Sequence, residues 1–130
     1  MRIISAAVLI VFVAGCSGPF FLLPGGALAG AEVPLNTANM PTEEAVLQLE
    51  TNPSDPYSVN VGFRLIDGQI YIDPAIERQW YQHLQADSNV RIRFAGAEVV
   101  HRAIAEVVTD AKVIANFESD RIVMRLVPQS

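Results

Sequence analysis

The alternation of apolar and polar side chains from residue 45 onward predicts a largely β structure. The clearest case is residues 57–66, where the side chains expected on one face are Val59, Val61, Phe63 and Leu65. Asp67-Gly68 follows as a strong two-residue hairpin signal, so residues 69–72 form the return strand. The predicted strands cover residues 45–50, 57–66, 69–72, 90–95, 97–108 and 121–127.

Two helices are predicted between these strands. Asp73-Pro74 is a typical helix start, with Asp as the N-cap and Pro at the first helical position, and this helix should run to about Ala86. Its inward stripe should be formed by Ile76, Trp80 and Leu84. Thr109-Asp110 predicts a second, shorter helix that ends at about Phe117. Six strands, two helices and tight turns in residues 43–130 favour a small barrel with helical plugs, a mainly β fold of the α+β class.

The N-terminal residues have a different pattern, that of a secretion signal. Met1-Arg2 is a basic start, the run Ile3–Val13 is apolar apart from Ser5, and small residues precede Cys16, the only cysteine of the chain. The run Val13-Ala14-Gly15-Cys16 resembles the lipobox of bacterial lipoproteins, in which a peptidase cuts before the cysteine and a diacylglycerol is attached to its sulfur. An uncleaved membrane anchor, a cleaved signal with a free thiol and a buried cysteine are the alternatives.

The lipobox resemblance implies three parts: a signal peptide over residues 1–15, a lipidated tether over residues 16–42 and a domain over residues 43–130. Residues 17–41 are rich in Pro and Gly and have no sustained periodicity, which is typical of a spacer. Within them, the apolar residues Phe20 to Leu23 either lie in the membrane interface or cap the domain. The resemblance also implies a cell-envelope protein that faces the periplasm or exterior. Because Ser17 rather than Asp follows the cysteine, it favours the outer membrane.

The charge balance narrows the classes of partner. Cleavage before Cys16 would remove Arg2 and leave eight basic residues against fourteen acidic ones, which argues against nucleic acid and against a polybasic membrane patch. Arg91 and Arg93 share one strand face, which predicts either an anion site or a solvated surface. His83 and His101 are the only histidines and lack the spacing of metal ligands, so no metal site is predicted.

Three consecutive segments resemble the split β-barrel family that includes pyridoxamine 5′-phosphate oxidases and deazaflavin-dependent nitroreductases. They are the hairpin end Asp67-Gly68-Gln69-Ile70-Tyr71-Ile72, the helical residues 78–87, and the strand Asn89-Val90-Arg91-Ile92-Arg93-Phe94 with its Gly96 turn. The resemblance spans residues 57–110, about half of the chain after Cys16. It implies a small split β-barrel and a homodimer that holds FMN or a deazaflavin between its subunits.

The expected phosphate-binding junction departs from the family pattern. Among residues 72–78, only Arg78 is cationic, while Asp73 and Glu77 would face a phosphate with like charge. Residues 52–58, where the nitroreductase branch carries a Gly-Arg-Lys type of motif, contain no basic residue. The resemblance therefore supports the fold more strongly than the cofactor.

Four residues are candidates for contact with such a cofactor. Arg64 lies on the polar face of its strand, Arg78 is at the junction, Trp80 could stack on an isoalloxazine ring, and His83 matches a family position often held by Asn or His. Each also has an ordinary interpretation, as a solvated or ion-paired arginine, a core tryptophan or a packed histidine. No catalytic residue is assigned. Two functions stay open: an oxidoreductase that binds a flavin-like planar cofactor, and a non-catalytic binding or structural module of the envelope.

Overall fold

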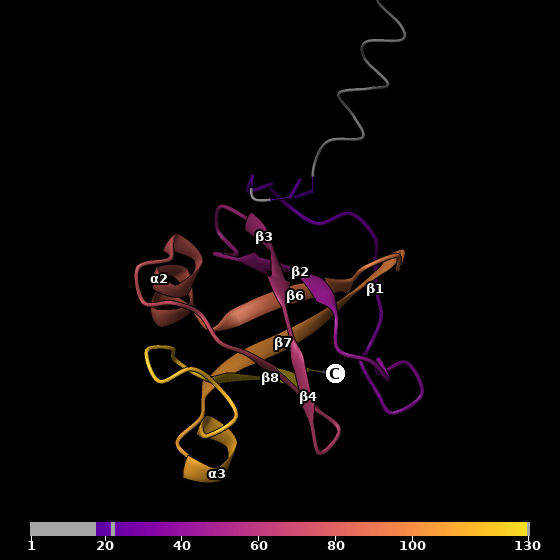
Figure 1. Cartoon of the computed structure of the whole chain (residues 1–130). Coiled ribbons are helices and arrows are strands. Elements are labelled where there is room, and N and C mark those ends of the chain that lie inside the picture. The colour runs from indigo at the N-terminus through magenta and orange to yellow at the C-terminus, as the bar shows by residue number, and fades with distance from the viewer. Residues whose placement is uncertain (1–17, 22, 130) are drawn as a thin grey trace, which may run out of the picture.

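The computed structural model describes residues 18–21 and 23–129, which form one curled sheet with two helices (Figure 1). The predicted signal peptide and Cys16 lie outside the described residues. The strands are β1 (Ala31–Glu32), β2 (Val46–Thr51), β3 (Tyr57–Gly62), β4 (Arg64–Ile66), β5 (Gln69–Ile72), β6 (Asn89–Phe94), β7 (Val99–Val107) and β8 (Met124–Pro128). The helices are α2 (Gln79–Ala86) and α3 (Ala111–Ile114). None of the described helices has the length and apolar character needed to cross a bilayer.

The order of the strands explains why the sheet curls. It runs β3-β2-β6-β7-β8-β5-β4, with antiparallel pairing along this path. β3 and β4 are therefore at opposite ends of the path, yet only Phe63 separates them in the chain. The sheet must bend round on itself to bring those two edges together. This arrangement confirms the predicted fold class, mainly β with two helices.

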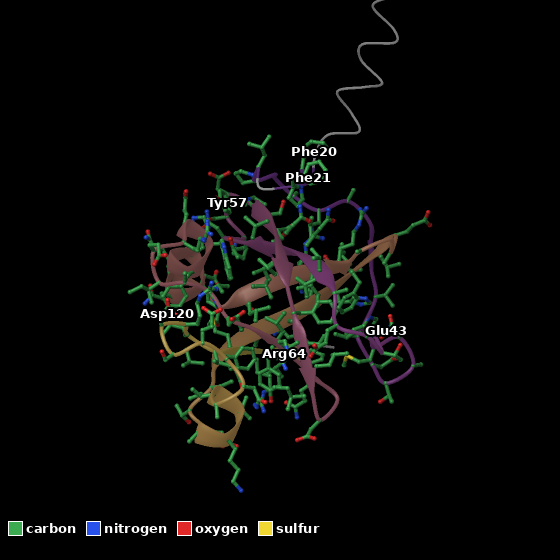
Figure 2. The ribbon with its side chains drawn as sticks, viewed as in Figure 1. Phe20, Phe21, Glu43, Tyr57, Arg64 and Asp120 are labelled. Carbon is green, nitrogen blue, oxygen red and sulfur yellow. The ribbon has the colours of Figure 1, made fainter. Side chains whose placement is uncertain are left out.

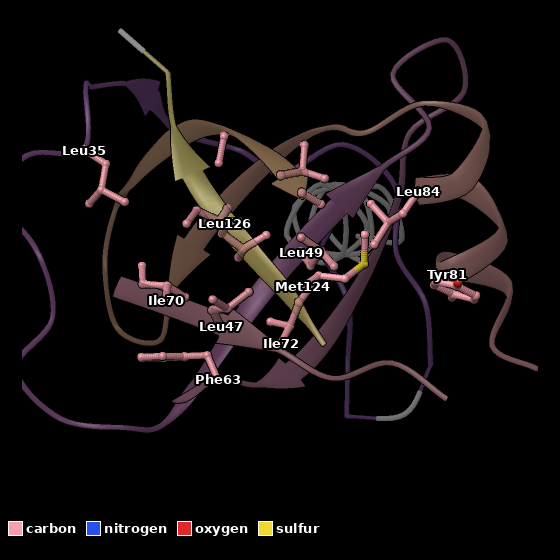
Figure 3. Packing of buried hydrophobic residues seen from close by; sticks show 14 residues of the cluster. Leu35, Leu47, Leu49, Phe63, Ile70, Ile72, Tyr81, Leu84, Met124 and Leu126 are labelled. Carbon is pink, nitrogen blue, oxygen red and sulfur yellow. The ribbon is translucent and has the colours of Figure 1, made fainter. Parts of the chain in front are cut away.

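Apolar packing fills the inside of the bent sheet (Figure 3). Leu47 and Leu49 of β2 and Ile92 of β6 are completely buried at the centre. Leu84 and Tyr81 extend this cluster to α2. Each such side chain contributes about 1.5–3 kcal/mol by burial. The cluster consists of Leu35, Leu47, Leu49, Phe63, Ile70, Ile72, Tyr81, Leu84, Val90, Ile92, Ala103, Ala105, Met124 and Leu126.

The strand predicted over residues 57–66 is divided in two, which corrects the prediction. At Phe63 the backbone leaves the β3 ladder, and the Phe63 N–H donates to the carbonyl of Ala45 at 3.0 Å. The Phe63 side chain is buried in the core, while the next residues pair with β5 instead of β2. Alternation identified the apolar face, but it carries no information about which neighbour each half of the strand pairs with.

The first helix begins at Gln79, so the prediction of a start at Asp73-Pro74 was wrong. Ala75 pairs with Arg121 in an isolated bridge, and the Ile122 N–H donates to the carbonyl of Pro74 at 3.1 Å. These pairings hold residues 73–75 extended beside the chain that leads to β8, and a turn over residues 75–78, closed by the Arg78 N–H and the Ala75 carbonyl at 3.1 Å, precedes the helix. The N-cap is Arg78, which makes no side-chain capping bond.

The inward face of this helix also differs from the predicted stripe. Ile76 precedes the helix and is exposed, and Trp80 is only partly buried against the core. Tyr81 and Leu84 are the buried residues of α2. The later start explains the difference, because the stripe was counted from a first turn that does not form.

The second helix and the last strand are shorter than predicted. Asp110 is confirmed as the N-cap of α3, where its carboxylate accepts from the Lys112 N–H at 2.9 Å. The helix ends at Ile114 and the final strand begins at Met124, whereas the expected limits were Phe117 and Arg121.

Residues 25–35, here called the strap, lie along the barrel. Gly25 pairs with Ser58, and β1 pairs in parallel with β7. Leu28 and Leu35 are buried. The sequence pattern placed this segment in a spacer without regular structure, so β1 was missed. The predicted domain limits, with a tether over residues 16–42, stay a prediction.

Candidate functional site

A cleft of about 450 Å³ lies between β3 and the connection from β5 to α2, here called the β3–α2 cleft. Its volume is within the range of small-molecule sites. Tyr57, Val59 and Val61 line it from alternate positions of β3. The opposite wall carries the polar and aromatic groups Asp73, Glu77, Arg78, Trp80 and Arg121.

The local folding of residues 73–78 creates this polar wall. Ala75 pairs with Arg121 and Pro74 with Ile122, so residues 73–75 are extended, and a turn closed by the Arg78 N–H and the Ala75 carbonyl at 3.1 Å then leads into α2. A helix beginning at Pro74 would have spread the side chains of this segment around its axis. The departure from the predicted helix start is therefore the feature that shapes the site.

Asp73 and Arg121 interact at the base of this wall. Arg121 Nη1 donates to the Asp73 carbonyl oxygen at 2.9 Å and lies 4.0 Å from its carboxylate. Burial raises the pKa of Asp73, and Glu118 adds to this effect while Arg121 opposes it. The guanidinium of Arg121 is thus already bound to Asp73.

Arg78 is the cation of the cleft that is open to a ligand. It is exposed and forms no ion pair with any residue that the structure describes. Glu77, its neighbour in the chain, lines the same cleft and is exposed as well. An anionic ligand in the cleft would therefore contact the unpaired guanidinium of Arg78 and lie near the carboxylate of Glu77, as the residues of the junction predicted.

His83 lies beside the cleft and contacts Tyr57. The two rings meet edge to face with their centres 5.0 Å apart. His83 Nδ1 is 2.9 Å from Thr51 Oγ1, and the Thr51 hydroxyl donates to the Tyr57 carbonyl at 3.1 Å. Since a hydroxyl has one proton to give, Nδ1 must donate to Thr51. Through this chain of contacts His83 fixes Tyr57 at the edge of the cleft.

Arg64 is not one of the residues that line the cleft. Figure 2 shows it well apart from Tyr57, Phe20 and Phe21. Its Nε pairs with the Glu44 carboxylate at 3.0 Å, and Nη1 donates to the Asn116 carbonyl at 3.1 Å.

The surroundings of Arg64 match its ordinary interpretation as an ion-paired arginine. Its guanidinium lies over the ring of Phe117, 5.4 Å from the centre. The Leu65 N–H bonds to the same carboxylate of Glu44 and, together with Arg64, lowers the pKa of that group.

The structure thus brings two of the four predicted residues into one cleft. Arg78 and Trp80 line it, His83 supports its edge, and Arg64 belongs to a separate surface cluster. Sequence reasoning missed Tyr57 and Arg121. The alternation that begins at Tyr57 could have pointed to the first, but no signal linked Arg121 to residues 73–78.

The donor set of the cleft matches a planar organic ligand better than a metal. Among the residues that the structure describes, no group of three His, Cys, Asp or Glu side chains is placed to hold a metal ion. Tyr57 and Trp80 supply aromatic surface for a ring system. For the phosphate of FMN the match is partial, because Asp73 and Glu77 share the wall with Arg78.

Comparison with known proteins defines the fold but not the family. No protein-family model matches the chain, and no curated protein does. A candidate pyridoxamine 5′-phosphate oxidase from Listeria innocua matches with a TM-score of 0.55 and 15% identity, over 65% of this chain and 84% of its own. The heme storage protein HutZ from Vibrio cholerae gives 0.51 and 16%, over 65% and 82%. The fold is a small split β-barrel.

A third split barrel of the same kind is a protein of unknown function from Agrobacterium tumefaciens. It matches with a TM-score of 0.53 and 14% identity, over 67% of this chain and 49% of its own. Identities this low establish the fold alone. Because the names of these split barrels refer to different ligands, the function must be argued from the residues of the cleft.

Proposed function

We propose that the chain is a ligand-binding split barrel whose β3–α2 cleft takes a planar, flavin-like molecule. The observation that carries this proposal is the meeting of Trp80, Tyr57 and the uncommitted Arg78 in one cleft of about 450 Å³. The aromatic side chains offer faces for an isoalloxazine ring, and Arg78 offers a partner for an anionic tail. A bound FMN or deazaflavin would supply hydride-transfer chemistry, for which the cleft provides binding and orientation.

A second function rests on the acidic residues of the same wall. Asp73 and Glu77 oppose a phosphate, and Arg121 is already bonded to the Asp73 carbonyl. Burial of a phosphate beside two carboxylates is costly. This favours the alternative in which the barrel binds an uncharged planar molecule, or none, and acts as a non-catalytic module of the envelope.

Tryptophan fluorescence tests the ligand proposal directly, because Trp80 is the only tryptophan of the chain. The full-length protein in detergent is titrated with FMN, with riboflavin, which has the same ring without phosphate, and with a deazaflavin. Binding in the cleft quenches Trp80 emission and leaves a visible flavin band after desalting. Failure of every flavin to quench or to be retained by folded protein would refute the flavin assignment.

Charge variants separate the two functions. Arg78→Ala should weaken FMN more than riboflavin, whereas Glu77→Gln should strengthen FMN alone. The matched control is Arg125→Ala, which removes an arginine that is paired with Glu106 away from the cleft. Heme serves as a further probe because one similar structure is a heme storage protein. Retention of heme without any flavin would overturn the flavin assignment.

We also propose that the barrel is attached to a bacterial envelope membrane, with the outer membrane favoured, through an acylated Cys16. The support is the sequence before the barrel, with its basic start, apolar run and small residues that end at the single cysteine. Cys16→Ser should abolish labelling by a radioactive fatty acid. Persistent labelling of this variant would refute the attachment site.

A homodimer is the proposed assembly, because the resembled family holds its cofactor between two subunits. Flavin titration and sedimentation of the same sample test this together. A monomer that binds flavin with full occupancy would show that one copy completes the site.

A further inference from the structure

The three most exposed large apolar side chains of the described residues gather on one turn near the N-terminus. Phe20 and Leu23 are each 66% exposed and Phe21 is 76% exposed. These three residues are here called the apolar tip. Figure 2 shows Phe20 and Phe21 at one end of the barrel, the end at which Tyr57 lies. An apolar cluster that is held out in water commonly marks a binding surface.

The apolar tip is held in place by the fold. The backbones of Phe20 and Leu23 exchange hydrogen bonds of 3.0 and 2.9 Å, and Asn60 of β3 donates to the Phe21 carbonyl at 3.0 Å. Phe21 has a φ of 52°, which is uncommon for a residue with a bulky side chain. The rings of Phe20 and Phe21 meet edge to face. The fold therefore presents these rings to solvent from a fixed position.

The chain segment that carries the apolar tip has no charged side chain. Residues 17–31 contain no ionisable side chain, and no lysine or arginine occurs between Arg2 and Arg64. The Phe21 carbonyl is already paired with Asn60. Aromatic and aliphatic side chains on an uncharged segment are suited to the interface of a bilayer. The arginines of the cleft that Phe21 lines, Arg78 and Arg121, are balanced there by Asp73 and Glu77, so the attraction would be mainly hydrophobic and would not require anionic lipids.

The distance from Cys16 places the apolar tip at the membrane, a step that rests on the proposed acylation. Phe20 follows Cys16 by four positions, and four residues span at most about 14 Å when fully extended. The polar layer on each side of a bilayer is about 5–8 Å thick. The strap follows Phe20 in the chain and is bound to the barrel, so the barrel stays close to the tip. The lipid therefore keeps the tip within reach of the interface.

We propose that the apolar tip inserts into the membrane interface and orients the barrel on the bilayer. Phe21 also lines the β3–α2 cleft, so this contact would place the cleft beside the membrane surface. The partner is a lipid surface, and zwitterionic lipids suffice. The barrel would then rest on the membrane instead of standing clear of it.

Fluorescence quenching by brominated lipids tests the contact. Two single-tryptophan chains are made in a Trp80→Phe background and reconstituted into phosphatidylcholine vesicles. Phe21→Trp reports on the tip, and Ile114→Trp is the matched control on α3, an exposed apolar position away from residues 18–25 (Figure 1). The tip reporter should lose most of its emission to brominated lipid, while the control should keep its emission. High salt should leave this difference unchanged.

Each outcome separates the contact from the anchor. Protein that floats with the vesicles but leaves both reporters equally unquenched would refute the tip contact and retain the lipid anchor. Protein that does not float would refute the anchor and the contact together. If the chain self-associates and the tip reporter is shielded from solvent in the absence of lipid, a second copy covers the tip, and the lipid contact is refuted. Circular dichroism establishes that both variants are folded.

Discussion

Replacement of Glu50 by Gln should loosen the strap and destabilise the whole barrel. Glu50 is only 6% exposed, and both of its carboxylate oxygens are occupied. Arg91 binds them in a bidentate manner, through Nε at 2.9 Å and Nη2 at 2.8 Å. The Leu28 N–H of the strap donates to the same carboxylate at 2.6 Å, and Arg91 Nη2 donates to the Leu28 carbonyl at 3.0 Å. One buried ion pair thus holds both polar backbone groups of a strap residue.

The magnitude follows from what the variant leaves behind. Breaking a fully buried ion pair from one side costs about 3–5 kcal/mol of unfolding free energy. Arg91 is partly exposed and keeps the Leu28 carbonyl and a 3.4 Å contact with Glu32, while the amide oxygen of the Glu50→Gln variant could still accept one hydrogen bond. We therefore expect a loss of about 2–3 kcal/mol. A loss of this size lowers the folding equilibrium constant about 30- to 150-fold.

Urea denaturation of the full chain measures this loss. The midpoint should fall, while the slope of the unfolding free energy against urea concentration should stay unchanged. The matched control is Glu106→Gln, which breaks a 3.0 Å pair with Arg125 whose side chains are both well exposed. That variant should lose at most about 1 kcal/mol. If the two variants lose the same amount, the Glu50 pair does not clamp the strap. Limited proteolysis should also cut Glu50→Gln faster within residues 25–35.

Three further substitutions test the core, the cleft and the edge of the cleft. Leu49→Ala should lose about 2–5 kcal/mol of unfolding free energy, because Leu49 is fully buried. Val46→Ala on the same strand should lose far less, because Val46 is exposed, and urea denaturation compares the two variants. Asp73→Asn should stabilise the protein at neutral pH, because burial disfavours the charged carboxylate. The gain should shrink as the pH falls through the raised pKa toward the ordinary value of 3.8, measured by urea denaturation across pH. Thr51→Val should leave His83 Nδ1 without its partner and lose about 1–3 kcal/mol, with thermal denaturation as the assay.

Local rules predicted the elements that depend on neighbouring residues in the chain. Asp67 and Gly68 have φ values of 51° and 74°, as a tight hairpin turn requires, and the Asp110 side chain caps α3 as expected. The same kind of rule was wrong at Asp73-Pro74, where capping chemistry favoured a helix start. There, pairing of Ala75 with Arg121 decided the outcome, and a contact between residues so far apart has no local signature.

The strap was missed for a related reason. Its polar contacts use backbone carbonyls, which every residue has: Arg93 binds the Ala29 carbonyl at 2.9 Å, and His101 binds the Val33 carbonyl at 2.7 Å. From the sequence, Arg91 and Arg93 favoured a solvated face or an anion site. Their actual partners are the strap backbone and, for Arg91, two glutamates. Side-chain patterns cannot identify a partner that consists of main chain.

The sequence predicted two of the four candidate residues correctly as residues of the cleft, because those two are close together in the chain. Arg78 and Trp80 are near neighbours in the chain, so the junction of residues 72–78 and the helical residues 78–87 that follow it located them side by side. Arg64 was grouped with them on the basis of strand polarity, but the break at Phe63 moves it to the edge that pairs with β5. Arg121 enters the cleft only through its bridge to Ala75. Residues that reach a site by tertiary pairing require the structure.

If Cys16 is acylated as proposed, the spacer predicted over residues 16–42 and the interface contact that was one alternative for Phe20 to Leu23 would be two states of one segment. With the strap bound, the barrel follows closely behind Phe20, and Cys16 is at most about 14 Å from the apolar tip. If the strap detached, the roughly 30 residues between Cys16 and Val46 would behave as a flexible linker with a typical span of about 30 Å. The barrel could then leave the membrane. Because Glu50 and Arg91 hold Leu28 through both of its backbone groups, we expect loss of this pair to favour the detached state, with the pairing of β1 and the bridge at Gly25 as the remaining contacts of the strap. Under the proposed anchoring, the ion pair between β2 and β6 would thus help to set the position of the cleft relative to the bilayer.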